Sequence, residues 1–267
     1  MEICQSHLPI KPWAHAVTRR LPGTQPIGPD DWLLIDDAFD LQMQYADQLI
    51  ATRRADVVAS SEIAAEAEAE VLDTVLAWTR TQPGYGHSPT QVIRPDGVTI
   101  DIAAETPLIT ARRLVQEDLL IHLSGEHEHW LASGVLTFPA SWALHQKVGR
   151  GLTGVHDPVT AYTDKIAVRV ERLFKGLQIH RPIMRANVLL YDDPDLFQPR
   201  LEGDDRDRAN ANRYVRVERQ CLIRLPKTRA VVFSIHSFVM PTSQLSARDF
   251  AAIRRHVHGA SGDTQIP

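Results

Sequence analysis

Three strand-like runs in the second half of the chain constrain the fold most strongly. They span residues 183–191, 214–225 and 230–239, and apolar side chains alternate with polar ones along them, which is the period of a β-strand with two distinct faces. Only Pro226-Lys227-Thr228-Arg229 separates the last two runs, and this turn predicts an antiparallel hairpin. Strands in consecutive meanders, with helices grouped between them, predict an α+β fold with an antiparallel sheet and flanking helices.

The remaining elements are shorter or helical. The apolar spacing predicts helices over residues 39–55 and 62–80, a helix that begins at Asp157-Pro158, and a closing helix over 246–257. Short strands are expected at 32–35, 91–93, 98–102, 119–123 and 135–138. No internal repeat or low-complexity linker interrupts the chain. We therefore expect one domain over residues 1–267, with residues 1–30 wrapping its surface and residues 240–267 forming a helix and a tail.

The charges are divided unevenly along the chain. Residues 1–134 carry 9 basic and 20 acidic side chains, whereas residues 135–267 carry 20 basic and 13 acidic ones. Of the 29 cations, 24 are Arg. A nucleic-acid-binding protein is more often basic overall and richer in Lys, so no nucleic-acid partner is expected. The rigid guanidinium groups of arginine favour binding of carboxylates or phosphates at defined positions instead.

Several classes of protein are disfavoured by what the sequence lacks. No apolar run is long enough for a transmembrane helix, and the N-terminal residues do not have the pattern of a signal peptide. Cys4 and Cys221 are far apart in unlike contexts, which excludes a disulfide framework or a thiolate zinc site. We expect a cytoplasmic protein that does not bind a membrane. No hydrolase or kinase motif is present.

Two local motifs allow more than one interpretation. The run from Gly149 to Gly154 matches a dinucleotide-binding glycine motif, but no strand-like segment precedes it, which favours a loop that lets the backbone approach something closely. The histidines at 122, 127 and 129, with Glu126 and Glu128 between them, would suit either a metal site or a solvated turn.

The strand faces identify candidate binding residues. Alternation places Arg219 within an apolar row, where a lone guanidinium needs an anionic partner. The other face carries Arg216, Glu218 and Gln220. Arg216 and Glu218 would form an internal ion pair, or the arginine side chains would bind an anionic ligand. On the preceding strand Arg185 and Asn187 point to one side together. Polar side chains that converge over one face of a sheet would form a ligand-binding surface.

His156 stands between the glycine-rich loop and the predicted helix that begins at Asp157. It is either a hydrogen-bonding loop histidine or an axial ligand of iron, since imidazole suits iron. His180 and His236 are competing ligands.

Beyond these patterns, the chain carries a set of short motifs in a fixed order over roughly residues 20–240. They are Asp31-Trp32-Leu33-Leu34-Ile35-Asp36, Glu117-Asp118, Phe138-Pro139-Ala140-Ser141-Trp142, Lys147-Val148-Gly149, Val155-His156-Asp157-Pro158-Val159, Tyr162, Arg185-Ala186-Asn187, Arg216-Val217-Glu218-Arg219-Gln220, Leu225-Pro226 and Val232-Phe233. In the identity and order of these motifs the sequence resembles the heme-dependent oxidative N-demethylase family. The motifs are specific together and weak singly.

The resemblance implies a PAS-like fold that binds heme b as a catalytic site. It implies oxygen-dependent removal of a methyl group from a small secondary amine such as dimethylamine, with release of formaldehyde. Electrons would come from NADPH through reductase subunits that carry flavin and an iron–sulfur cluster. Two cysteines cannot hold a four-cysteine cluster, which agrees with carriers on other chains.

The sequence departs from the family pattern at three positions. Val188 follows Asn187 where Trp is usual, Thr160 replaces a proline, and Cys221 stands where Thr is common. A change from Trp to Val beside the site would reshape the pocket and with it the choice of amine.

The resemblance and the strand faces together assign roles. His156 would be the axial ligand, and Arg219, with Arg185 or Arg216, would pair with the heme propionates. Glu218 would hold the substrate ammonium or move its proton. Tyr162 and Asn187 would hydrogen-bond substrate or oxygen.

Two alternatives stay open beside the enzyme. One is a non-catalytic PAS-like sensor of heme or a small ligand, and the other is a scaffold subunit without chemistry. A sensor should carry or contact an output module, and none is expected on this chain, which favours the enzyme.

Overall fold

The computed structural model describes residues 2–14, 23–155, 164–204 and 212–259. The α-helices of this part are α1 (Phe39–Thr52), α2 (Arg54–Val57), α3 (Ala65–Thr79), α4 (Pro107–Arg112), α5 (Leu152–Val155), α6 (Asp164–Gly176) and α7 (Ala247–Gly259). The strands are β1 (Gln25–Pro26), β2 (Val58–Ala59), β3 (Gly86–His87), β4 (Gln91–Ile93), β5 (Thr99–Asp101), β6 (Asp118–Ser124), β7 (His129–Val135), β8 (Ile183–Tyr191), β9 (Tyr214–Arg224) and β10 (Val231–Pro241).

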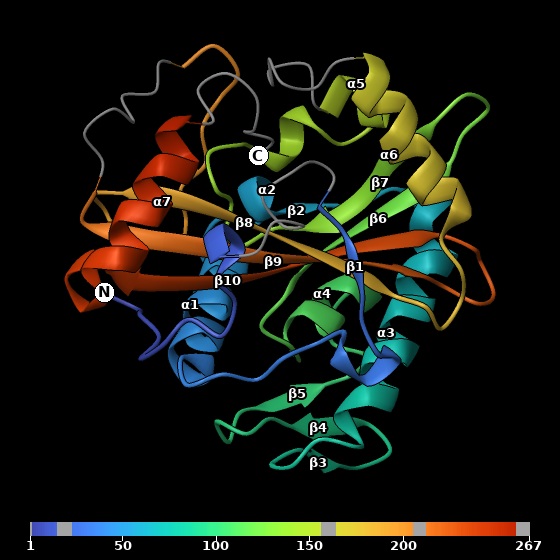
Figure 1. Ribbon diagram of the computed structural model, residues 1–267. Coiled ribbons are helices and arrows are strands. Elements are labelled where there is room, and N and C mark those ends of the chain that lie inside the picture. The colour runs from blue at the N-terminus through green and yellow to red at the C-terminus, as the bar shows by residue number, and fades with distance from the viewer. Residues whose placement is uncertain (1, 15–22, 156–163, 205–211, 260–267) are drawn as a thin grey trace.

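The described strands form a seven-stranded sheet in the order β1-β8-β9-β10-β6-β7-β2, and a small sheet in the order β3-β4-β5. Every strand pair in both sheets is antiparallel. Figure 1 shows the large sheet crossing the molecule, with the small one set apart below it. The predicted α+β class, an antiparallel sheet with flanking helices, is confirmed.

The predicted hairpin forms the centre of the large sheet. β9 and β10 pair along eleven positions, from Tyr214 opposite Pro241 to Arg224 opposite Val231. β8 pairs with the other edge of β9, and Asn187 lies directly opposite Glu218. These long strands form because β-branched and aromatic residues alternate along them. The register therefore decides which polar side chains meet.

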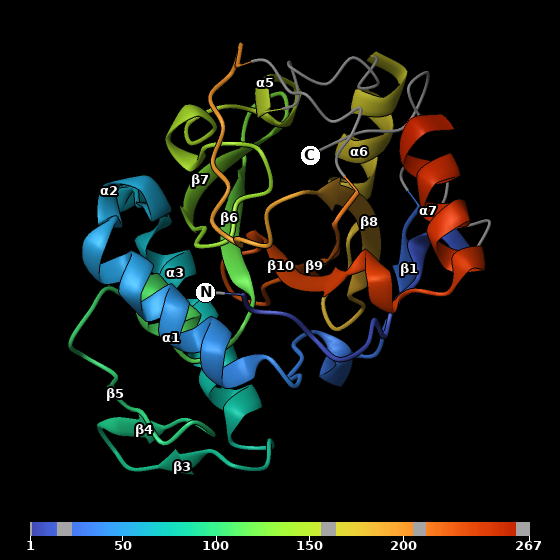
Figure 2. The same cartoon turned by 90° about the vertical axis from the view of Figure 1, so that its left-hand side faces the viewer.

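The sheet has two faces, which we name from β9. The outer face carries Val215, Val217, Arg219 and Cys221, and the inner face carries Arg216, Glu218, Gln220 and Leu222. Figure 2 shows β8, β9 and β10 curling, so that helices on one face of the sheet stand on different sides of the molecule.

Different helices cover the two faces. α7 packs through Ile253 and Val257 on the outer face, and the helices α1, α3 and α4 contribute to a second core on the same side. α5 and α6 cover the inner face, where Phe174 of α6 packs with Leu222 and Val231. The polar side chains farther along the inner face are bonded by the segments around Phe138 and Leu196.

Two predicted strands are wrong, and the same cause applies to both. Residues 32–35 form no strand, because side chains bond this backbone: Arg219 donates to the Trp32 carbonyl, and Leu34 N donates to Glu117. Over 135–138, the carboxylate of Asp118 accepts from the backbone N–H groups of Thr137 and Phe138, and β7 ends at Val135. The strands predicted at 91–93 and 183–191 have the predicted bounds, and the other predicted strands are present with shifted ends.

Helices are present where they were predicted in the described residues, although the helix predicted over 39–55 is divided at Arg53 into α1 and α2. The helix predicted from Asp157 is present from Asp164 onward, and residues 156–163 lie outside the described part. The glycine-rich run is a loop leading into α5, without the strand that a dinucleotide site needs. A Cβ added to Gly151 would lie 2.0 Å from Glu128 Oε1, so glycine is needed there for close approach, as the loop interpretation predicts.

Candidate functional site

A cluster of polar side chains lies on the inner face of the sheet. Asn187 Nδ2 and Gln220 Nε2 both donate to Glu218 Oε2, each at 3.1 Å. All three side chains are buried. The two amides hold the carboxylate in one orientation, and they leave its second oxygen without an amide donor.

Arg216 lies beside this carboxylate. Its Nη2 stands 3.3 Å from Glu218 Oε1, so the internal ion pair considered from the sequence is present. The rest of the guanidinium bonds the carbonyl oxygens of Phe138 and Leu196 and the hydroxyl of Ser237. Arg216 therefore ties the Phe138 and Leu196 segments to the sheet, and few of its donors remain for a ligand.

Three buried polar atoms of the cluster have no hydrogen-bond partner within the described part of the chain. They are Asn187 Oδ1, Glu218 Oε1 and Arg216 Nε. Buried polar atoms in folded proteins are almost always bonded. Their concentration on neighbouring residues of one sheet face indicates a place where a ligand supplies the missing partners.

Arg185 adds a cation to the edge of the cluster. It lies opposite Gln220 in the register and is half-buried. Burial lowers the pKa of its guanidinium to about 10, against the opposing effect of Glu218, so the group stays charged at neutral pH. It makes no hydrogen bond or ion pair with residues 2–14, 23–155, 164–204 or 212–259. This guanidinium is available to an anionic group.

Apolar side chains border the polar cluster. Ile235, opposite Gln220 on β10, is buried with Leu120 and packs near Val155 at the end of α5. Leu222 packs with Phe174 of α6. Together these residues give the inner face both a polar centre and an apolar border.

The structure separates Arg219 from the other predicted residues. Its side chain lies on the outer face and donates to the carbonyl oxygens of Asp31 and Trp32, at 2.8 Å for Trp32. The anionic partner expected for this buried charge is therefore replaced by backbone oxygens. Its place in an apolar row was predicted correctly, but its partner was not.

His236 is engaged on the outer face as well. Its Nδ1 lies 2.9 Å from Glu117 Oε1 and its Nε2 lies 3.1 Å from Asp36 Oδ2. Burial lowers the pKa of His236, but the two carboxylates outweigh it and raise the pKa to about 9. An imidazolium with both nitrogens bonded has no lone pair for iron.

His180 lies elsewhere. It is exposed and borders a hollow of about 350 Å³ that is also lined by Trp32, Ile223 and Pro226. His156 and Tyr162 lie outside the described residues. Val155, the residue before His156, packs against the apolar cluster that contains Leu120 and Ile235.

The histidine-rich run has a structural role that the sequence did not indicate. Glu128 Oε2 accepts from the backbone N–H and the hydroxyl of Thr153, each at 2.9 Å, in the first turn of α5. The backbone N–H and Nδ1 of His129 contact the carboxylate of Glu171 on α6, at 3.0 and 2.9 Å. No group of three or more metal-ligating side chains gathers in the part of the chain that is described. The run anchors both helices above the inner face.

The inner face carries residue types that could hold a heme group and a polar substrate. Arg216 Nε and the Arg185 guanidinium, which has no hydrogen bond to a described residue, suit carboxylate side groups. The acceptors Asn187 Oδ1 and Glu218 Oε1 suit a hydrogen-bond donor on a substrate, and the apolar border suits a flat macrocycle.

Comparison with protein families gives one match over nearly the whole chain. A family model described as haem-dependent oxidative N-demethylase, alpha subunit-like, matches residues 23–264. The chain belongs to this family. Membership associates it with heme and with oxidoreductase chemistry, and the alpha-subunit description implies other subunits. Among the described residues, no helix has the length and apolarity needed to cross a membrane.

Proposed function

We propose that this protein is a heme b-dependent, oxygen-using N-demethylase that converts a small secondary amine such as dimethylamine to the primary amine and formaldehyde. The observation that carries the proposal is the buried carboxylate of Glu218, which two amides orient while its Oε1 has no hydrogen bond. Aliphatic amines are protonated at neutral pH, and a buried carboxylate is a suitable partner for an ammonium group.

Glu218 and Asn187 would bind the amine together. Glu218 Oε1 and Asn187 Oδ1 both lack a hydrogen-bond donor, and their side chains are bonded to each other. A secondary ammonium can donate to both oxygens. Glu218 would then accept the ammonium proton and release the amine in its neutral form.

The remaining roles concern the cofactor. Arg185 is the better candidate partner for a heme propionate, because Arg216 is bonded to carbonyl oxygens and Arg219 lies on the outer face. His156 remains our proposed axial ligand, and Tyr162 a proposed hydrogen-bond donor to substrate or oxygen. A bound heme would supply the redox centre for oxidation of the carbon next to nitrogen. Electrons would come from NADPH through partner subunits that carry flavin and an iron–sulfur cluster.

Turnover with a supplied reductase tests the proposal. Formaldehyde should accumulate from dimethylamine in proportion to the oxygen consumed. Oxygen uptake that no amine alters would contradict the demethylase and favour the sensor. In a separate experiment, His156→Ala should change the Soret band of the reconstituted protein, and an unchanged spectrum would contradict the axial assignment.

A further inference from the structure

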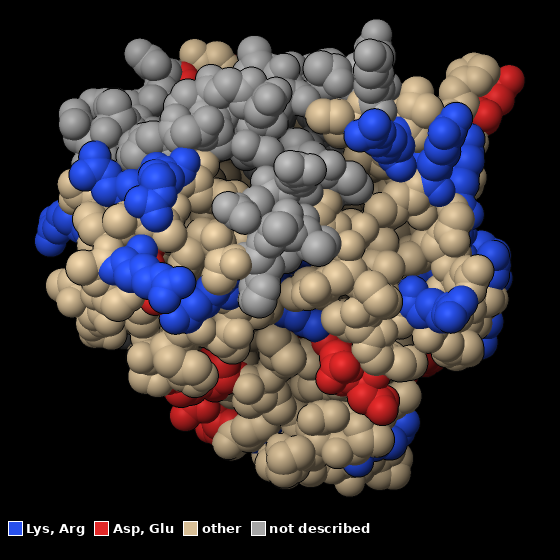
Figure 3. Space-filling model, viewed as in Figure 1, with Lys and Arg blue, Asp and Glu red and all other residues tan. Residues whose placement is uncertain are grey.

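Two helices, α6 and α7, carry exposed arginines that take no part in the proposed binding site. Arg169 and Arg172 lie on α6, and Arg254 and Arg255 lie on α7. All four are exposed, and none forms an ion pair with another described residue. Figure 3 shows basic side chains gathered on both flanks of one face of the molecule, over these two helices.

Two acidic side chains of the same helices that the structure describes are engaged elsewhere. Glu171 of α6 is bonded to His129, and Asp249 of α7 is bonded to Lys11 and Trp13. Their charges are largely compensated within the molecule. The exposed arginines of the two helices are therefore not paired with either of these carboxylates.

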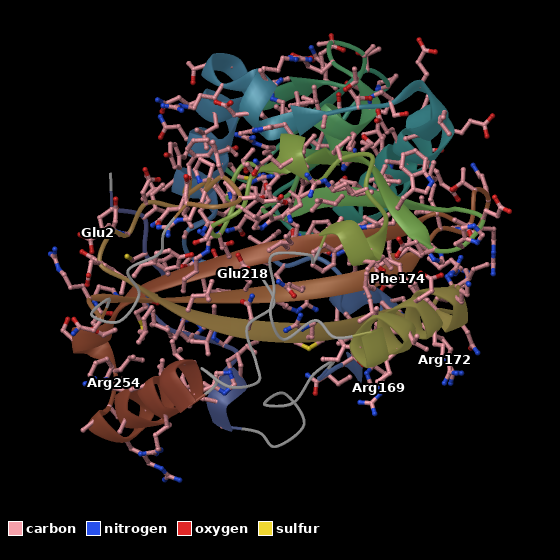
Figure 4. All side chains as sticks on the ribbon, turned by 90° about the horizontal axis from the view of Figure 1, so that it is seen from above. Glu2, Arg169, Arg172, Phe174, Glu218 and Arg254 are labelled. Carbon is pink, nitrogen blue, oxygen red and sulfur yellow. The ribbon has the colours of Figure 1, made fainter. Side chains whose placement is uncertain are left out.

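The two basic helices pack on opposite faces of the sheet, α6 on the inner face and α7 on the outer face. Figure 4 shows Glu218 between α6, with Arg169 and Arg172, and α7, with Arg254. Val168 stands among the α6 arginines with 51% of its surface exposed. In a protein interface such an apolar side chain can be covered at the centre while the charged residues form the rim, whereas a polyanion would leave it uncovered.

We propose that these arginines, together with Val168, form the docking surface for the subunit that delivers electrons, and that this partner presents an acidic face around its iron–sulfur cluster. The inference rests on the proposed function, because that function needs an external electron donor. The chain as a whole carries a net charge of −4, which disfavours a general polyanion such as nucleic acid or an anionic membrane. A local basic surface steers an acidic protein to the site without attracting polyanions to the whole molecule.

The test uses the full chain and a plant-type iron–sulfur ferredoxin, an acidic protein, as the probe. Binding is measured calorimetrically at low ionic strength, which requires no heme. Arg172→Glu and Arg254→Glu should each weaken binding about fivefold. Arg80→Glu at the end of α3 is the matched control, because Arg80 is also exposed, and it should leave binding unchanged. The difference should shrink as salt screens the charges.

A second readout follows the reduction of bound heme. Reduction by the ferredoxin should slow about fivefold in Arg172→Glu and Arg254→Glu, whereas reduction by dithionite should not change. An equal effect of Arg80→Glu, or no binding of the probe by the unaltered chain, would overturn the proposal. So would variants that keep ferredoxin binding but lose binding to phosphatidylserine vesicles or to duplex DNA. A chain that binds ferredoxin in the expected pattern but takes up no heme would uphold the docking surface and contradict the proposed function.

Discussion

The two faces of the central sheet contain buried charged residues that differ in how completely they are bonded. On the outer face Arg219 and His236 have backbone or carboxylate partners on both sides of their charged groups, and the one unbonded atom beside them is Oε2 of Glu117 among the described residues. On the inner face, one residue away along β9, Glu218 keeps an oxygen without a hydrogen bond. Fully bonded buried charges hold segments of chain together, whereas an incompletely bonded cluster has capacity for a ligand.

Replacing the inner carboxylate should have the largest effect. Glu218→Gln keeps the shape of the side chain but removes the charge that would hold the ammonium and accept its proton. Formaldehyde release should fall by about 10²–10⁴-fold, the usual contribution of a positioned acid or base. Ser234→Ala is the control, because it removes the outer-face hydrogen bond from Trp32. It should lower stability without lowering the rate by more than about twofold. Equal losses of rate in both variants would contradict the distinction between the faces.

Removing a cation from each face compares their roles in stability. Arg219→Ala leaves the carbonyl oxygens of Asp31 and Trp32 without donors and should reduce the free energy of unfolding by about 3 kcal/mol. Arg185→Ala removes a half-buried cation without a hydrogen bond to any described residue and should cost less than about 1 kcal/mol. Urea denaturation of both apo-proteins measures the difference. A larger loss for Arg185→Ala would reverse our assignment.

The outer face should also give the protein a measurable pH dependence. The pKa of His236 is raised to about 9 in the folded protein, against about 6.5 when unfolded. Its contribution to stability is therefore complete below pH 6.5 and is lost as the pH rises through 9, a fall of roughly 3 kcal/mol. Unfolding of the apo-protein followed between pH 6 and pH 10 should show this fall, and His236→Gln should flatten it. A slope that persists unchanged in the variant would assign it to another group.

The smallest expected effects concern the anchors above the inner face. Glu128→Ala removes the carboxylate that accepts from Thr153 at the start of α5 and should cost about 1 kcal/mol. Gly151→Ala should displace the same carboxylate, because the added Cβ would lie 2.0 Å from Glu128 Oε1. Since both changes break one interaction, their effects on unfolding should not add in the double variant. Additive losses would show that Gly151 acts independently of Glu128.

Alternation along the strands was enough to predict which residues share a face. Arg185 and Asn187 lie together, as do Arg216 and Glu218, because successive side chains of a strand point to opposite sides. The meeting of Asn187 with Glu218 could not be predicted, since it depends on the register between β8 and β9. The partners of Arg219 were missed for a related reason, because they are carbonyl groups of a segment far away in the sequence.

Segments held by side chains were also mispredicted. Residues 32–35 and 135–138 have strand-like composition, yet Glu117 and Asp118 accept their backbone N–H groups in place of a neighbouring strand. Local propensity does not reveal such competition, because the accepting carboxylates lie many residues away. The anchoring role of Glu128 and His129 was hidden in the same way, since their partners lie on α5 and α6.

The central claim is that the inner face holds heme and amine together, and a visible absorption titration tests it most directly. The purified protein, supplied with hemin, should show a Soret band that changes and saturates as dimethylamine is added. Glu218→Gln should keep the band and lose its response to the amine, whereas Ser234→Ala should keep both. A protein that stays colourless with hemin, or a Glu218→Gln variant that responds like the unaltered protein, would contradict the account.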